Sequence, residues 1–193
     1  MLLDLEVFKR SQFRTCMGEW GDREGRNFNN LVKKLLKKRD EEEWRANLYK
    51  RSKLILYRKL KDRLVLEKYV VEFEREERKQ FAMLRGGTNK LRVETGRWLG
   101  ESREERTCNV CLCQEVEDEK RFLLECNIYT REREKMFERI KSECELEAIE
   151  QLDKDDQIQI LIGIGWRKQE QAIRKIVLNY IMKANKIRNK YIK

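Results

Sequence analysis

Hydrophobic residues recur with a helical period along most of the chain. From Phe28 onward they stand three and four positions apart, which is the pattern of one helix face. The first such stripe consists of Phe28, Leu31, Val32, Leu35 and Leu36. A second helix is predicted to start at Asp40–Glu43, because acidic side chains suit the positive N-terminal end of a helix. This second helix is expected to end near Asp62.

Further helices are predicted in the rest of the chain. Their expected ranges are 64–73, 74–84, 117–144, 157–164 and 166–191. Gly86 and Gly87 should stop the 74–84 helix, since glycine readily adopts the left-handed conformation found at helix C-termini. Acidic residues at Asp153–Asp156 should cap the 157–164 helix. Segment 91–96 is too short and mixed to assign, and both an extended strand and a turn fit it.

The predicted fold class is therefore all-α, a helical bundle with a small irregular cysteine hairpin that has the spacing of a degenerate zinc knuckle. We expect an N-terminal helical region over 1–107, the knuckle over 108–130 and C-terminal helices over 131–193, together forming one compact domain. The absence of proline in 193 residues leaves long helices with few interruptions. No stretch approaches 18 consecutive apolar residues, so no transmembrane helix is expected.

Four clustered cysteines carry the clearest chemical signal. Cys108 and Cys111 form a Cys-x-x-Cys pair, and Cys126 follows at the distance of a third zinc ligand. Arg121 stands where a ligating histidine would be expected, and arginine cannot bind a metal because it does not deprotonate in proteins. Three arrangements fit: zinc on four cysteines including Cys113, zinc on three cysteines and water, or a metal-free hairpin. The metal-free hairpin would be held by the packing of Leu112, Val116, Phe122 and Leu123.

The surrounding sequence resembles a known family. Three motifs follow one another over about residues 80–130. They are a run from Leu84 to Trp98, the Cys-x-x-Cys pair, and Glu-x-Glu-Asp-Glu-x-x-Phe-Leu-Leu-x-Cys-x-x-Tyr. In order and spacing they resemble the cysteine-rich region downstream of the polymerase in non-LTR retrotransposon reverse transcriptases, with a weaker likeness over 44–73. The likeness implies a module that engages nucleic acid beside the knuckle. This chain departs from the family at Arg121, where histidine is usual, and at Asn127, where proline is usual.

Charge also favours a polyanionic partner, RNA or single-stranded DNA. The net charge is +10, and residues 157–193 hold nine basic side chains and one acidic, while 108–156 hold eight basic and 15 acidic. Neutralised phosphates release counterions, so basic ends favour binding. The residues expected to contact nucleic acid are Arg85, Arg92, Arg97, Trp98, Lys33, Lys37, Arg174 and Lys183. Trp98 could instead belong to the core, and the alternative function is a helical protein–protein interaction or structural protein with incidental basic charge.

Catalysis is not expected. The chain has no histidine, which excludes a Ser-His-Asp or Cys-His mechanism within it. Asp155 and Asp156 invite comparison with the metal-binding aspartates of polymerases, but their surroundings predict a helix N-terminus. No phosphate-binding glycine loop is found. Cysteines in no regular framework and the lack of an apolar signal segment favour a nuclear or cytoplasmic location over secretion, with Cys16 and Cys144 as buried thiols.

Overall fold

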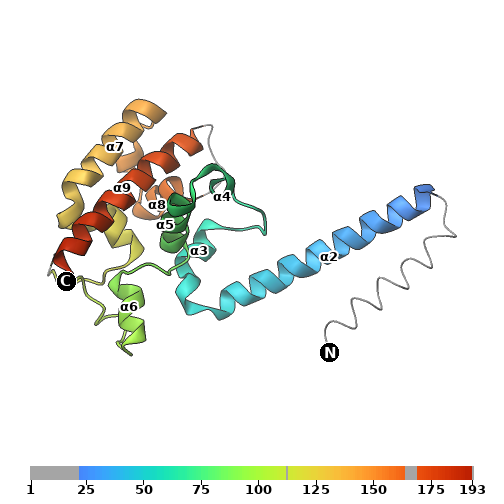
Figure 1. Ribbon diagram of the computed structural model, residues 1–193, viewed down its shortest axis with the longest axis horizontal. Helices are drawn as coiled ribbons and strands as arrows, with labels where there is room; N and C mark the ends of the chain where they lie inside the picture. Colours follow the sequence, from blue (N-terminus) through green and yellow to red (C-terminus); the bar gives the residue numbers. More distant parts are fainter. Residues whose placement is uncertain (1–21, 112, 164–168, 193) are drawn as a thin grey trace. The chain divides into compact units, whose positions relative to one another are not determined.

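The computed structural model describes residues 22–111, 113–163 and 169–192, with side chains from residue 27 onward. Every regular element in these ranges is helical (Figure 1), which confirms the all-α prediction. The α-helices, labelled as in Figure 1, are α2 (Asp22–Lys50), α3 (Ile55–Leu60), α4 (Tyr69–Glu72), α5 (Arg75–Arg85), α6 (Arg92–Trp98), α7 (Thr130–Cys144), α8 (Lys154–Ile162) and α9 (Glu170–Tyr191). None of the described helices has the length and apolarity needed to cross a membrane.

One long helix, α2, covers the first predicted helix and the start of the second, and the short helix α3 lies in the rest of the second range. The acidic run at Asp40–Glu43 lies inside α2, so the prediction that it starts a new helix is wrong. These carboxylates instead form ion pairs along the helix, such as Arg45 with Glu41 at 3.0 Å. The helix also ends earlier than expected, at Lys50, because Arg51 is extended.

The chain divides into two compact units, residues 1–47 and 48–193. In the first unit the predicted helical stripe is present, but Leu31, Leu35 and Leu36 are exposed. The second unit contains the hydrophobic core, together with the cysteine hairpin.

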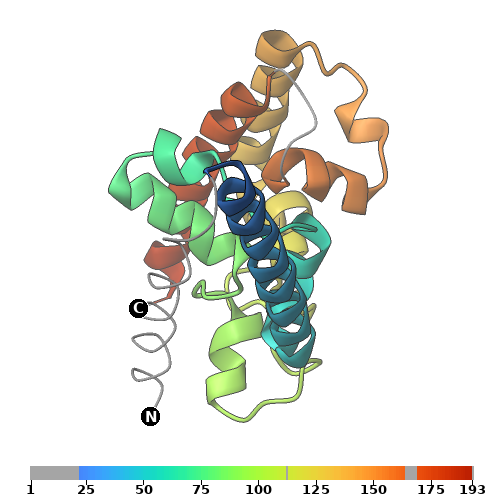
Figure 2. The same cartoon turned by 90° about the vertical axis from the view of Figure 1, so that its right-hand side faces the viewer.

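The core of the second unit is built around α9. Helix α7 lies alongside it (Figures 1 and 2), and α5 and α8 also pack against it. The apolar stripe of α9, in the range 166–191 that was predicted to be helical, faces this core through Ile173, Ile176, Val177, Tyr180, Ile181 and Ala184. Cys144 at the end of α7 is buried, as predicted, while Cys16 and the expected helix start at Trp166 lie outside the described residues.

Several connections differ from the predicted pattern. In segment 91–96, left unassigned between strand and turn, Leu91 is the N-cap of α6 and residues 92–96 lie in this helix. The expected 64–73 helix is reduced to the single turn α4. The 117–144 helix is interrupted by a π-helical turn, Arg121–Glu125, and a 3-10 turn, Asn127–Tyr129, before α7 begins.

Two predicted helix ends are confirmed. Gly87 follows α5 with φ +60°, the left-handed conformation, although Gly86 before it does not adopt this conformation. The side chain of Asp153 accepts hydrogen bonds from the backbone N–H groups of Asp155 and Asp156 and thereby caps α8.

Candidate metal centre and nucleic-acid interface

The cysteine segment forms a short hairpin. Thr107 and Val116 make an isolated antiparallel bridge, and the Cys108 N–H donates to the Glu115 carbonyl at 2.9 Å. Gln114 takes a left-handed φ of 53°, which lets the chain reverse direction within a few residues. This hairpin brings Cys108 and Cys111 together at one end.

Cys126 reaches the same place from the π-helical turn. Its N–H donates to the Arg121 carbonyl five residues earlier, at 2.9 Å, and the wider turn ends at this cysteine. The Sγ atoms of Cys108, Cys111 and Cys126 all lie within 4.8 Å of one another. Zinc–sulfur bonds of about 2.3 Å in a tetrahedral site place sulfur atoms about 3.8 Å apart. Small side-chain adjustments would therefore let these three thiols hold one metal ion.

Cys113 does not join this cluster as a fourth ligand. It is exposed, and a disulfide joins it to Cys111 across 5.5 Å between the two Cα atoms. Three of the four expected sulfur ligands therefore lie close enough together for one metal ion, and Cys111 is available to it only when this disulfide is reduced.

Arg121 lies beside the sulfur atoms, where the sequence lacks a histidine. Its side chain is only 8% exposed. The guanidinium contacts the Cys113 Sγ, lies 3.6 Å from the Cys111 Sγ, and pairs with Glu115 and, at 4.0 Å, with Glu125. A positive charge therefore stands next to the thiols.

The two buried thiols, Cys108 and Cys126, are hydrogen-bonded to each other. A hydrogen bond from the Cys126 thiol lowers the pKa of Cys108 to about 6. The same hydrogen bond, followed by burial, raises the pKa of Cys126 well above its ordinary value. Cys108 is thus disposed to ionise near neutral pH, and the thiolate is the form that binds metals.

Glu117 joins the hairpin to two helices. Its carboxylate, 1% exposed, accepts from both Nε and Nη2 of Arg188 on α9, at 2.9 and 2.8 Å. It also accepts from the Arg92 N–H at 2.8 Å, while its backbone carbonyl accepts from the Val93 N–H at 3.0 Å. The start of α6 is thereby fixed to the hairpin. The sequence does not indicate this role of Glu117, because Arg188 lies 71 residues away and no local pattern links the two.

At the other end of α6, Trp98 is 70% exposed. The core alternative for Trp98 is therefore wrong, whereas Val93 is buried. Arg97 beside it is half-buried and pairs with Glu94 at 3.4 Å. Arg92 is mostly buried and pairs with Glu101, a carboxylate that the sequence analysis did not connect with it.

Two of the expected nucleic-acid contacts are corrected by burial. Arg85 is 1% exposed, pairs with Glu67 and lies over the rings of Tyr69 and Phe81. Arg174 is 3% exposed and pairs with Glu170 on α9 and with Glu72 at 3.1 Å. Neither guanidinium reaches the surface.

The three lysines of the expected interface remain accessible. Lys33 and Lys37 are exposed one turn apart on α2, in the first unit. Lys183 on α9 is half exposed and lies 3.5 Å from Glu132.

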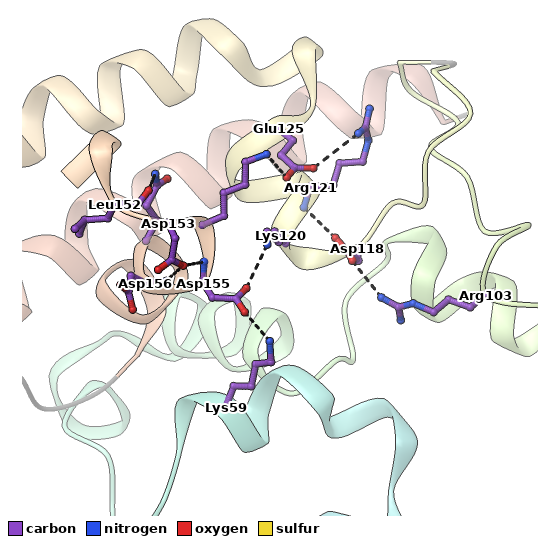
Figure 3. A network of polar contacts seen from close by, with 12 residues as sticks. Lys59, Arg103, Asp118, Lys120, Arg121, Glu125, Leu152, Asp153, Asp155 and Asp156 are labelled. Carbon is purple, nitrogen blue, oxygen red and sulfur yellow. Dashed lines mark hydrogen bonds and ion pairs between the residues drawn. The ribbon is translucent and has the colours of Figure 1, made fainter. Parts of the chain in front are cut away.

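A network of charged side chains (Figure 3) includes residues that line one cavity of the described structure. Asp155 accepts from Lys59 at 2.8 Å and from Lys120 at 3.2 Å, and Asp118 accepts from Arg103 at 3.1 Å. These two lysines hold the pKa of Asp155 below its ordinary value. Asp155 and Asp156 thus stand at a capped helix start, which the sequence favours over a polymerase site, and Asp155 also forms ion pairs.

The cavity itself has a volume of about 440 Å³ and a mixed lining. Its apolar wall includes Leu56, Leu60 and Ile158, and its rim carries as many carboxylates as basic groups. A cavity with equal numbers of acidic and basic groups does not favour the binding of a polyanion.

Comparisons with known proteins do not assign this chain to a family. No protein-family model, curated protein or solved structure matches this chain. The candidate function therefore rests on the residues themselves.

Proposed function

We propose that this chain is a non-catalytic module that binds RNA or single-stranded DNA beside a zinc-binding cysteine hairpin. The observation that carries the proposal is the exposed Trp98 at the end of a helix whose start is fixed to that hairpin by Glu117. An exposed tryptophan stacks on unpaired bases, at about 1–3 kcal/mol per base. Placing Trp98 on a short, anchored helix lowers the entropy lost when it stacks. The likeness to the post-polymerase region of non-LTR retrotransposon reverse transcriptases supports the same function.

The metal part of the proposal rests on the three converging thiols. Cys108, Cys111 and Cys126 would hold zinc as thiolates, and zinc would supply structural free energy, on the order of 10 kcal/mol for a small module. Arg121 makes no bond to the metal, but its positive charge would offset part of the negative charge of the thiolates.

Metal analysis of the reduced protein, purified without chelator, tests this part. We expect close to one zinc per chain and its loss in Cys126→Ser. Arg121→His is the informative second variant, because it would add a fourth ligand and should bind zinc at least tenfold more tightly. A folded protein without zinc, unchanged by Arg121→His, would refute the metal site.

Binding to a fluorescent single-stranded oligonucleotide tests the nucleic-acid part. Trp98→Ala should weaken binding roughly tenfold, the lower part of the stacking range, while Trp98→Phe should keep most of the affinity. Leu99→Ala is the matched control, since Leu99 is the next residue, is equally exposed and has no ring. Equal losses in the Trp98 and Leu99 alanine variants, or no binding by the parent protein, would refute stacking.

Salt dependence separates phosphate contacts from stacking. If Lys33 and Lys37 both contact phosphates, the double alanine variant should flatten the slope of log affinity against log salt by about 1.4 for single strands. An unchanged slope would remove these lysines from the interface.

The alternative, a protein–protein interaction module, is favoured by the exposed leucines of α2. Leu31, Leu35 and Leu36 present apolar surface that a helical partner could cover. A mass that increases with concentration in sedimentation, and that Leu35→Lys abolishes, would support this alternative.

A further inference from the structure

The Cys111 sulfur belongs both to the three-cysteine cluster and to a disulfide. Its Sγ lies within 4.8 Å of those of Cys108 and Cys126, and it is also bonded to Cys113. Metal ligation requires a thiolate, and a sulfur in a disulfide carries no negative charge to donate. Cys111 can therefore serve the metal or the disulfide, but not both.

The two partners of Cys111 differ in their access to solvent. Cys113 is exposed, whereas Cys108 and Cys126 are buried. The Arg121 guanidinium contacts the sulfur atoms of both Cys111 and Cys113. Arg121 is itself only 8% exposed, so the exposed Cys113 is the sulfur of this pair that a dissolved oxidant can reach. An oxidant would thus meet Cys113 first and leave the buried pair untouched.

We propose that Cys111 and Cys113 form a redox switch that controls the metal site. In the reduced state Cys111 completes the three-thiol cluster. In the oxidised state its bond to Cys113 leaves only Cys108 and Cys126, and the metal is released. This inference rests on the proposed metal binding.

The exchange balances with a small disulfide, such as oxidised glutathione, as the oxidant. The Cys113 thiolate attacks one sulfur of the small disulfide, which breaks that bond, forms a mixed disulfide and releases one glutathione thiolate. The Cys111 thiolate then attacks the Cys113 Sγ and releases the second. Two electrons pass from the protein to the small disulfide. The Cys113 thiol supplies one proton to the glutathione thiolates, and solvent supplies the other, because the zinc-bound Cys111 thiolate carries none.

The test uses the full chain loaded with zinc under reduction by a phosphine. After removal of the phosphine, oxidised glutathione is added and released zinc is followed with a coloured chelator, while alkylation and peptide mapping identify the oxidised cysteines. We expect the parent protein to release one equivalent with a Cys111–Cys113 disulfide, and to rebind it after reduction. Cys113→Ser, an exposed substitution, should release zinc at least tenfold more slowly.

Each part of the proposal can fail separately. Release at the parental rate from Cys113→Ser, or zinc retained on protein that carries the Cys111–Cys113 disulfide, would overturn the switch alone. A zinc affinity that falls at least tenfold in reduced Cys113→Ser would identify Cys113 as a ligand and also overturn it. No zinc on fully reduced parent protein would refute the metal site and, with it, the switch.

Discussion

Glu117 has more structural partners than its place in an acidic run suggests. Replacing it by glutamine keeps the size of the side chain but leaves the buried guanidinium of Arg188 without a counter-charge. Removing one partner of a buried ion pair typically costs about 3–5 kcal/mol. We therefore expect Glu117→Gln to lower the free energy of unfolding in urea by about 3 kcal/mol or more, with Glu134→Gln, an exposed change, as the neutral control. A loss below about 1 kcal/mol, the usual range of surface ion pairs, would contradict this role.

For Glu119 we expect the opposite effect on stability to that expected for Glu117. Burial raises the pKa of its carboxyl, although the Asn89 side chain donates to it at 3.0 Å. A carboxyl with a raised pKa binds more protons in the folded state, so stability falls as pH rises from the unfolded pKa through the folded one.

Glu119→Gln should therefore stabilise the protein at pH 7, because the amide oxygen can still accept from Asn89 without carrying a charge. The gain should disappear at about pH 3.5, below the ordinary pKa of glutamate, where the parental carboxyl is protonated in both states. Urea unfolding of both proteins at pH 7 and at about pH 3.5 measures this difference in stability. A gain of equal size at both would assign the effect to packing instead.

At the scale of elements, the junction after α5 depends on Gly87. Its φ is +60°, and a Cβ at this position would meet the Lys53 carbonyl oxygen at 2.7 Å. Gly100 shares the positive φ, at +76°, but has open space around it. Gly100→Ala should thus report the cost of the backbone conformation alone, about 1 kcal/mol, while Gly87→Ala should cost at least about 1 kcal/mol more. Equal losses in thermal or urea unfolding would show that the junction relaxes around the new methyl group.

The helices with a clear apolar stripe were predictable from the sequence. α7 and α9 bury the faces that their periodicity indicates, because a core on one side selects residues three and four apart. Helix α6 was missed because its stability depends on backbone bonds to Glu117, 25 residues away, and not on a stripe of its own. The false helix start at Asp40 has a different cause. Acidic side chains suit a helix N-terminus, but they suit ion pairs inside a helix equally well.

The candidate site was only partly predictable for the same reason. Cysteine spacing indicated three thiols that the fold does bring together. Burial of Arg85 and Arg174 was not indicated, since their partners Glu67 and Glu72 are distant in sequence and arginine is usually exposed.

At the scale of the whole molecule, the two units should differ in stability. Leu31, Leu35 and Leu36 of α2 in the first unit are exposed, so among the described residues little core packing opposes local opening of this part of the helix, whereas the second unit has a continuous core. Brief trypsin treatment should therefore cut first within the lysine-rich part of α2 and leave a resistant fragment that begins near residue 51. Mass spectrometry of the time course identifies it. Early cleavage inside 75–163 would contradict this order.

Buried arginines give this digestion a second use. Trypsin needs the side chain of the residue before the cut bond to enter its specificity pocket, and Arg85, Arg121, Arg174 and Arg188 are all buried. The bonds after these four arginines become cleavable only when their surroundings open. The rate of cleavage after each of these arginines therefore measures how often the structure around it opens. Cleavage after Arg188 should be faster in Glu117→Gln than in the parent protein.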